Sequence, residues 1–495
     1  MRTMLAFSSK NETESGEHLT VKNSVERRSL EHKTLLIRKK MLIITILLIL
    51  ALTATSTTFN FEVDGGAKAN DDKWDTVLQN GKRLNESFAS LKPGDSLLIP
   101  EGKTFYLMGG IVARNLTDVT IQIDGTLKFG STLLDDIDKK YIDAWPRTGN
   151  GNDAGVLECI SLYDSKNLTI TGSGNGVLDG QGAKWWGLPG IGYLEREENR
   201  PRLLHLNGGK HILVEHIFLK DSPYWTFLAD DVKHLEIRYS KIDAQRTSSK
   251  SHDILDLTAF NTDGFDVSGC DDVYIHDSSV FNQDDCFDVK DGTSNVVIER
   301  VNASGLGLTI GSISSTVNNI TFRDSRMDKT YKGIYIKFRG EGQISNVLYE
   351  NIVINEPTQW AVWIGPAQQC DGCSIKDMCS ANPCSLCWPT TDPWAKCNAV
   401  KGGLFENITL RNITINNPSK SSGVLIADPA MPMKNLVFDN VVVNNPKTKP
   451  FKNYYVENAP GIALGSTSPV PPGFTDMTIK SQVRSLNLRS AGRVG

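Results

Sequence analysis

The sequence predicts an all-β protein folded as a single right-handed parallel β-helix with an N-terminal capping helix. A polar residue followed by alternating apolar residues recurs along the chain, as in His211-Ile-Leu-Val, Asn295-Val-Val-Ile and Asn407-Ile-Thr-Leu. Consecutive copies often begin 22 to 28 residues apart. Units of this length cannot bury a core alone, but stacked units can. The 42 glycines among 495 residues also favour a turn-rich β protein.

Two other repeat architectures fit less well. Leucine-rich repeats share the period but require a Leu-x-x-Leu-x-Leu frame that the chain lacks, and propeller blades need about twice the period. Composition narrows the function classes as well. With 39% hydrophobic and 22% charged residues the chain is neither disordered nor a polytopic membrane protein, and a net charge of −4 argues against nucleic-acid binding.

The N-terminal region predicts export from the cell. Residues 1–40 form an extension that ends in Arg38-Lys39-Lys40, and an apolar run over 41–52 follows. This run is shorter than the ~20 residues that span a bilayer. We therefore expect a signal peptide over 41–56, starting at Met1 or Met41, and a protein secreted to the extracellular space or cell wall without stable membrane association. The alternative is an uncleaved signal anchor.

The remaining chain predicts one domain. The coils are expected over 57–465, with a C-terminal tail over 466–495. An amphipathic helix from Lys73 to Ser90 is expected to plug the N-terminal end of the tube. Its apolar residues are Trp74, Val77, Leu78, Leu84 and Phe88.

Cysteine and asparagine patterns agree with export. Six of nine cysteines fall in an insert at 370–397, which predicts a disulfide-stapled loop, with zinc binding as the alternative. Cys159, Cys270 and Cys286 remain, an odd number, so one free thiol is expected. The candidate N-glycosylation sites are Asn85, Asn115, Asn167, Asn302, Asn319, Asn407 and Asn412.

Two carboxylate-rich segments carry the candidate chemistry. They are Asn261-Thr-Asp263-Gly-Phe-Asp266 and Asn282-Gln283-Asp284-Asp285-Cys-Phe-Asp288. Asp263 and Asp284 are 21 residues apart, about one coil, so the two segments should lie on one face, ~4.8 Å apart. Clustered carboxylates raise one another's pKa, and an acid beside an ionised base is what glycosidic bond cleavage needs. The alternatives are ordinary turn residues or a calcium site.

Several blocks resemble the polygalacturonase family, glycoside hydrolase family 28. They are Asn261-Thr-Asp263, Gln283-Asp284-Asp285-Cys286, Gly305-Leu-Gly-Leu-Thr-Ile-Gly-Ser312, Val177-Leu-Asp-Gly-Gln-Gly182 and Ser222-Pro-Tyr-Trp225. The resemblance implies a pectin-lyase-like solenoid that hydrolyses α-1,4-galacturonosyl bonds of pectin with inversion and without metal or cofactor. It implies that Asp284 is the general acid and that Asp263 and Asp285 activate the water.

Two positions depart from that family pattern. Leu306 stands where the family usually has His in Gly-His-Gly, and Tyr335 stands where it has Arg in Arg-Ile-Lys. Residues 335, 337 and 339 share one face of a strand, so Lys337 and Arg339 are expected to bind a uronate carboxylate. Asn261, Gln283 and Tyr335 are further expected substrate-binding residues.

Three function classes remain open at this point. The leading one is a monomeric, endo- or exo-acting hydrolase of galacturonan. A pectate-lyase-like polysaccharide lyase is the second, because such lyases share the β-helix. A non-catalytic pectin-binding protein is the third, because the family His position is substituted.

Overall fold

The computed structural model describes residues 56–480, except 131–141, 143, 150–153, 187–198, 248, 254–255, 368–383 and 386–396, together with 34, 36–42 and 482. The chain divides into two units, Met1–Ser56 and Thr57–Gly495. In the first unit, residues 36–42 are helical. The predicted signal peptide lies mostly outside the described residues and stays a prediction. No described helix combines the length and apolar character that crossing a membrane requires.

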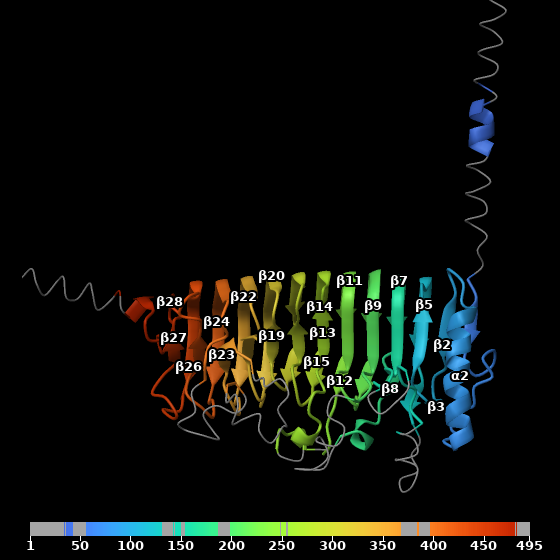
Figure 1. Ribbon diagram of the computed structural model, residues 1–495, viewed down its shortest axis with the longest axis horizontal. Coiled ribbons are helices and arrows are strands. Elements are labelled where there is room, and N and C mark those ends of the chain that lie inside the picture. The colour runs from blue at the N-terminus through green and yellow to red at the C-terminus, as the bar shows by residue number, and fades with distance from the viewer. Residues whose placement is uncertain are drawn as a thin grey trace, which may run out of the picture. The chain divides into compact units, whose positions relative to one another are not determined.

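The second unit is a stack of short parallel strands, seen side by side from β5 to β28 in Figure 1. All pairings between its named strands are parallel, and away from the two ends of the stack a strand pairs with strands one coil before and one coil after it. This arrangement is the predicted right-handed parallel β-helix. The strands are β1 (Thr58–Asn60), β2 (Ser96–Ile99), β3 (Thr104–Leu107), β4 (Ile111–Arg114), β5 (Thr117–Ile123), β6 (Thr126–Phe129), β7 (Ile160–Thr171), β8 (Val177–Asp179), β9 (Leu204–Glu215), β10 (Phe218–Lys220), β11 (Phe227–Arg238), β12 (Lys241–Asp243), β13 (Phe265–Ser268), β14 (Asp271–His276), β15 (Ser279–Phe281), β16 (Phe287–Val289), β17 (Ser294–Glu299), β18 (Asn302–Ser304), β19 (Leu308–Ile313), β20 (Thr316–Asp328), β21 (Ile334–Phe338), β22 (Gly342–Asn355), β23 (Val362–Pro366), β24 (Gly403–Asn416), β25 (Val424–Ile426), β26 (Lys434–Asn444), β27 (Tyr455–Glu457), β28 (Gly461–Gly465) and β29 (Thr475–Thr478).

The core follows from the alternation of the strands. Side chains of successive strand residues point to opposite faces, so every second residue enters the tube. Five such residues lie opposite one another in successive coils, and each is fully buried: Phe265, Phe287, Leu308, Ile334 and Val362. Complete burial of one such side chain contributes about 1.5–3 kcal/mol to folding. The residues between them point outward and are free to carry chemistry.

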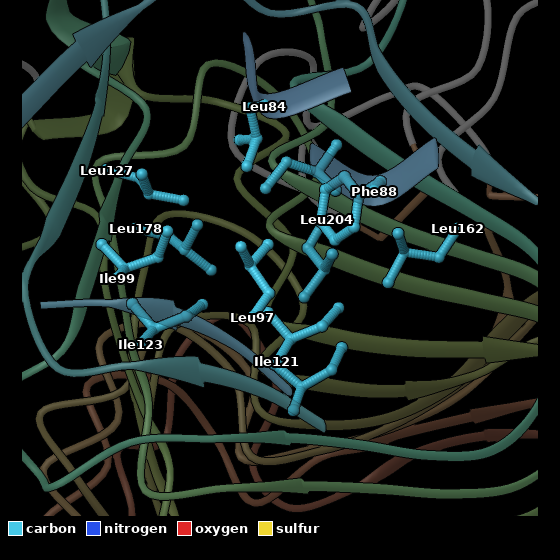
Figure 2. Close-up of a pocket in the computed structure, with 12 residues that line it drawn as sticks. Leu84, Phe88, Leu97, Ile99, Ile121, Ile123, Leu127, Leu162, Leu178 and Leu204 are labelled. Carbon is cyan, nitrogen blue, oxygen red and sulfur yellow. The ribbon is translucent and has the colours of Figure 1, made fainter. Parts of the chain in front are cut away.

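Helix α2 (Trp74–Ser90) caps the N-terminal end, as predicted. Leu84 and Phe88 point into the tube toward the aliphatic side chains of the first coils, including Leu97 and Leu204 (Figure 2). The void left among them is about 10 Å³, near the smallest space that holds one water. Leu78 was expected on this face but is 38% exposed, and it is the small residue Gly81 that lies close against Met108. Two short 3-10 helices, η1 (Gly182–Lys184) and η2 (Asp256–Thr258), lie in turns.

Asparagines stack on the outer turns of the coils. Asn407 donates its side-chain amide to Asn346 at 3.0 Å, and Asn435 donates to Asn407 at 2.8 Å. Each of these residues has a positive φ, a conformation that Asn tolerates better than most residues. The asparagines therefore form ladders, which lie on the exposed outer turns.

Two boundary and cysteine predictions need correction. β29 pairs with β28, so the stack continues past the predicted end at residue 465. Cys384 and Cys397 form a disulfide, in agreement with the predicted stapled insert, and the other insert cysteines lie outside the described residues. Cys159, Cys270 and Cys286 are all free and buried, so three thiols rather than one are unpaired. They are spread over different coils.

Candidate active site

Two neighbouring turns gather the candidate carboxylates on the outer face of the tube. One turn leads into β13 and carries Asp263, and the other joins β15 to β16 and carries Asp284 and Asp285. Phe265 lies opposite Phe287, a spacing of 22 residues. Asp263 is therefore level with Asp285 and not, as predicted, with Asp284. The prediction assumed a coil of 21 residues, but the turn before β16 contains one residue more.

Polar and glycine residues hold these turns in place. The Asn282 amide donates to the carbonyls of Thr262 and Asp285, each at 2.8 Å, and so ties the two turns together. The next coil leaves room for this contact only because residue 305 is glycine. A Cβ at Gly305 would stand 2.0 Å from Asn282 Oδ1. The backbone path across these coils thus depends on the Asn282 amide and on the absence of a side chain at Gly305.

Asp284 has the environment of a proton donor. Its carboxyl group accepts hydrogen bonds from the backbone N–H groups of Asn261 at 3.1 Å and Asp285 at 2.9 Å. Burial, followed by the negative charge of Asp285, raises the pKa of Asp284 to about 7, and the Lys337 ammonium opposes this rise. A carboxyl group with that pKa carries a proton for transfer near neutral pH.

Asp285 has the environment of an anion. The Lys337 ammonium lies 2.6 Å from its Oδ2. The Thr309 hydroxyl donates to its Oδ1 at 2.9 Å. The side chains of Asp285 and Lys337 are 3% and 9% exposed, so water screens this ion pair little. Two adjacent aspartates thus meet opposite surroundings, one suited to a proton and one to a negative charge.

A second group of carboxylates surrounds Lys290. Its ammonium bonds to Asp288 and lies 3.6 Å from Asp263 and 4.0 Å from Asp266. Burial raises the pKa of Asp263 and Asp266 well above the ordinary range and raises that of Asp288. Asp263 was predicted to share the base role with Asp285, but this raised pKa favours its protonated form. A carboxylic acid cannot act as a base until it loses that proton.

The sequence contains a signal for this second group. Asp266 and Asp288 follow Asp263 and Asp285 by three residues and fall opposite each other in register. Lys290 follows Asp288 by two residues and therefore lies on the same strand face. The alternation of side chains along a strand therefore predicts that Asp266, Asp288 and Lys290 lie close together.

The acidic clusters also meet a geometric criterion for cation binding. Ligand atoms lie within 4.8 Å of one another in two sets, Asp263/Asp266/Asp288 and Asp263/Asp284/Asp285. A lysine ammonium already lies against each set, Lys290 in the first and Lys337 in the second. A divalent ion would have to displace or repel that ammonium, so the residues fit a metal poorly. Metal independence stays a prediction.

Comparison with known proteins identifies the family. Residues 94–377 match the pattern of Glycosyl hydrolases family 28. The chain belongs to this family. It is therefore a glycosidase, and the predicted resemblance is confirmed.

Curated relatives of this family 28 chain include several with named activities. "Probable endo-xylogalacturonan hydrolase A" of Aspergillus niger is 28% identical over 322 residues, which cover 62% of this chain and 71% of that protein. "Endopolygalacturonase I" of Aspergillus niger is 28% identical over 208 residues, covering 41% and 54%. The latter match thus spans about half of the relative's length.

Solved structures agree on the fold. An exopolygalacturonase from Thermotoga maritima superposes with a TM-score of 0.59 at 17% identity, covering 82% of this chain and 90% of that one. A polygalacturonase from Erwinia carotovora gives 0.58 at 20% identity, covering 82% and 96%. At such low identity these matches support the β-helix and nothing finer.

The expected substrate-binding residues of this glycosidase fall in different surroundings. The backbone of Asn261 serves Asp284, as described above. Gln283 is buried, and its side chain bonds to the His252 ring at 2.8 Å and the Ser251 carbonyl at 3.1 Å. Gln283 thus fastens the segment before η2 to the turn that carries Asp284. A direct contact between Gln283 and substrate stays a prediction.

The predicted cationic face on β21 is only partly realised. Lys337 lies in the strand and points to Asp285. Arg339 lies beyond the strand end at Phe338 and is exposed, and the pairing of β21 with β19 shifts between Ile310 and Ile313. Tyr335 is 1% exposed, and its hydroxyl shares a hydrogen bond with Ser385 of the insert.

Proposed function

We propose that this family 28 enzyme hydrolyses pectic polysaccharides of the galacturonan class, at α-1,4-galacturonosyl bonds. The observation that carries the mechanism is the pair of adjacent aspartates with opposite surroundings, Asp284 with a pKa of about 7 and Asp285 against Lys337. The substrate class rests on relatives named for xylogalacturonan and polygalacturonate hydrolysis. An extracellular or cell-wall location is proposed from the expected signal peptide.

Each aspartate takes one step of the reaction. Asp284 donates its proton to the glycosidic oxygen as the bond to the anomeric carbon breaks. Asp285 accepts a proton from a water molecule, whose oxygen bonds to that carbon. The Lys337 ammonium holds the Asp285 carboxylate in place through their ion pair. Asp263 is proposed to assist Asp285 as a second base.

Inversion at the anomeric carbon remains a separate proposal. Inverting enzymes commonly hold their carboxyl groups about 6.5–9.5 Å apart, which leaves room for water, and retaining enzymes about 5–5.5 Å. The nearest oxygens of Asp263, Asp284 and Asp285 lie within 4.8 Å of one another. Family resemblance therefore supports inversion more than this spacing does. Proton NMR of the first product formed distinguishes the two outcomes by its anomer.

Uronate recognition is proposed for Arg339 together with Lys337. Arg339 is exposed and lies one residue past β21, whereas the carboxylates lie in the turns that lead into β13 and β16, at the other end of these stacked strands. We expect Arg339→Ala to raise KM for galacturonate oligomers and to affect the uncharged methyl esters less. Equal changes in KM for both substrates would show that Arg339 is a surface residue that does not bind the uronate carboxylate.

A reducing-end assay tests the proposed function. Polygalacturonate, xylogalacturonan and rhamnogalacturonan are the substrates, and an Asp284→Asn variant is the negative control. We expect reducing ends from at least one polymer, without absorbance of unsaturated products and without loss of activity in EDTA. Unsaturated products that require calcium would instead support a lyase, and binding without cleavage would support a non-catalytic protein.

A further inference from the structure

A column of lysines on the outer surface of the tube carries charges of one sign. Lys166, Lys210 and Lys233 lie opposite one another in β7, β9 and β11, strands that Figure 1 shows side by side. All three lysines are exposed, and none of them forms an ion pair with another side chain among the described residues. Three like charges thus follow one another at about the spacing of the coils, ~4.8 Å.

The outer surface also carries a column in which the charges alternate. Its members lie opposite one another from β17 to β26 and are Glu299, Arg323, Glu350, Arg411 and Asp439. Arg323 pairs with Glu299, and Arg411 pairs with Glu350 at 3.3 Å and with Asp439 at 3.4 Å. Opposite charges facing each other stabilise a sheet, whereas like charges destabilise it. The lysine column therefore lowers the stability that alternation would provide, which indicates a function other than folding.

A groove lies beside the lysine column. It has a volume of about 480 Å³ and is lined by residues of β7, β9, β11 and β14. Leu213, Glu236 and Tyr274 lie opposite one another in this lining and are partly exposed. The Glu236 carboxylate already pairs with Arg238 at 2.7 Å. The groove thus combines apolar and aromatic surface with a few polar groups, which suits a sugar ring with its apolar C–H faces and polar edge.

Two histidines connect the groove to the lysine column. His211 and His234 directly follow the second and third lysines in the chain, and both line the groove. Their rings stack, with centroids 4.6 Å apart and an angle of 7° between the ring planes. His234 donates from Nδ1 to the Asp272 carboxylate at 2.6 Å. The carboxylates in the groove lining, Glu236 and Asp272, are thus both paired within the chain, whereas the neighbouring lysine ammonium groups are not.

The lysine column is separate from the candidate active site. The residue in register after Lys233 is Asp271, at the start of β14. The four residues of β13 lie between Asp271 and the turn that carries Asp263, which corresponds to roughly 13 Å of extended strand. The lysines themselves lie in the coils before this one. A chain bound at the column is therefore held on another part of the surface from the reacting carboxylates.

We propose that Lys166, Lys210 and Lys233, together with the adjoining groove, form an accessory site that binds an acidic polysaccharide. This inference rests on the proposed function, which supplies the ligand class, because a galacturonan carries one carboxylate on each sugar residue. With a net charge of −4, the chain attracts a polyanion only through a local cluster of cations. Carboxylates that recur along an extended polymer meet lysines that recur from coil to coil, while sugar rings pack on Leu213 and Tyr274. The site retains long chains near the enzyme and leaves the reaction of short fragments unaffected.

Lys210→Glu tests the accessory site because it makes the lysine column alternate in sign. Binding of polygalacturonate is measured by isothermal titration calorimetry in an Asp284→Asn background, which prevents cleavage. We expect roughly a tenfold rise in Kd, with an unchanged or higher free energy of unfolding. Lys92→Glu makes the same charge change at an exposed lysine outside the column and should leave Kd unchanged. Equal Kd values for the two variants would overturn the proposal. If Lys210→Glu does not fold, Lys166→Gln/Lys233→Gln replaces it.

Substrate length and ligand type provide the second test. With Asp284 intact, Lys210→Glu should raise KM for polygalacturonate and leave kcat and KM for a short galacturonate oligomer unchanged. An equal rise in KM for both substrates would assign the effect to the active site and overturn the accessory site. Poly-L-glutamate has carboxylates but no sugar rings and should bind roughly tenfold more weakly than polygalacturonate; equally tight binding would overturn the role of the groove.

The same measurements separate this inference from the proposed function. Hydrolysis of polygalacturonate with no effect of Lys210→Glu on binding would support the proposed function and overturn the accessory site. Binding that depends on Lys210, without hydrolysis of any pectic polymer by the wild type, would support the accessory site and overturn the proposed function. Polygalacturonate that is neither bound nor cleaved would overturn both.

Discussion

Replacing Lys337 distinguishes two possible roles of this residue, an ion pair with Asp285 and the binding of a substrate carboxylate. In the structure its ammonium pairs with Asp285 at 2.6 Å, and both side chains are nearly inaccessible to solvent. From the sequence alone it was expected to bind a uronate carboxylate. A Lys337→Met variant keeps the aliphatic stem and removes the charge.

The size of the effect follows from the pair. At an effective dielectric constant of ~20, the attraction across this distance is about 6 kcal/mol before desolvation is subtracted. Removing one partner of a buried pair typically costs about 3–5 kcal/mol, because the other charge stays buried. We expect a loss of this size in the free energy of unfolding, measured by urea denaturation at neutral pH. Lys220→Met, which breaks a partly exposed pair with Asp179, should cost no more than about 1 kcal/mol.

The pH profile separates the two roles. Lys337 lowers the pKa of Asp284, so its removal should raise that pKa above about 7. Because Asp284 must be protonated, activity is lost as pH rises through its pKa, and the alkaline limb of kcat/KM should move to higher pH. Lys337→Arg should restore the wild-type limb. An unmoved limb, with a higher KM for charged substrates only, would refute the internal role and leave Lys337 as a uronate ligand.

Three further predictions use other features. Asp284→Asn should lower kcat by at least ~10²-fold in a reducing-end assay, with an unchanged circular dichroism spectrum. Because folding raises the pKa of Asp284 from 3.8 to about 7, its stabilisation is present below pH 4 and lost as pH rises through 7. The loss is roughly 4 kcal/mol and should be absent in Asp284→Asn when unfolding is followed across this range. In protein made through a eukaryotic secretory pathway, mass spectrometry should find glycans on the exposed Asn115 and Asn302 but not on Asn407, whose amide belongs to a ladder; full occupancy of Asn407 would contradict this.

The sequence predicted the tube and the location of the site because both depend on local periodicity. Alternation over a few residues fixes which side chains enter the core, and a repeat of about one coil brings Asp263 near Asp284 and Asp285. The exact register could not be obtained this way. One extra residue in the turn after β15 places Asp263 level with Asp285, and spacing alone does not show where a turn absorbs a residue.

The properties that distinguish the individual aspartates could not be predicted from spacing either. Their pKa values depend on burial and on which ammonium each one meets, and Lys337 is 52 residues from Asp285 in the chain. The burial of the Tyr335 side chain could not be predicted from the sequence either. It comes from Ser385, 50 residues further on, in an insert whose cysteines predict a disulfide but not the surface against which it packs.

The insert lengthens one coil without disturbing the stack. Asn407 reaches Asn346 across 61 residues, Asn435 reaches Asn407 across 28, and the pairings of β22 with β24 and of β24 with β26 are nevertheless continuous. Strand pairing thus stays in register from one coil to the next even where the coils differ in length. Exchanging this one loop is therefore expected to leave the strand register, and with it the positions of the reacting carboxylates, unchanged.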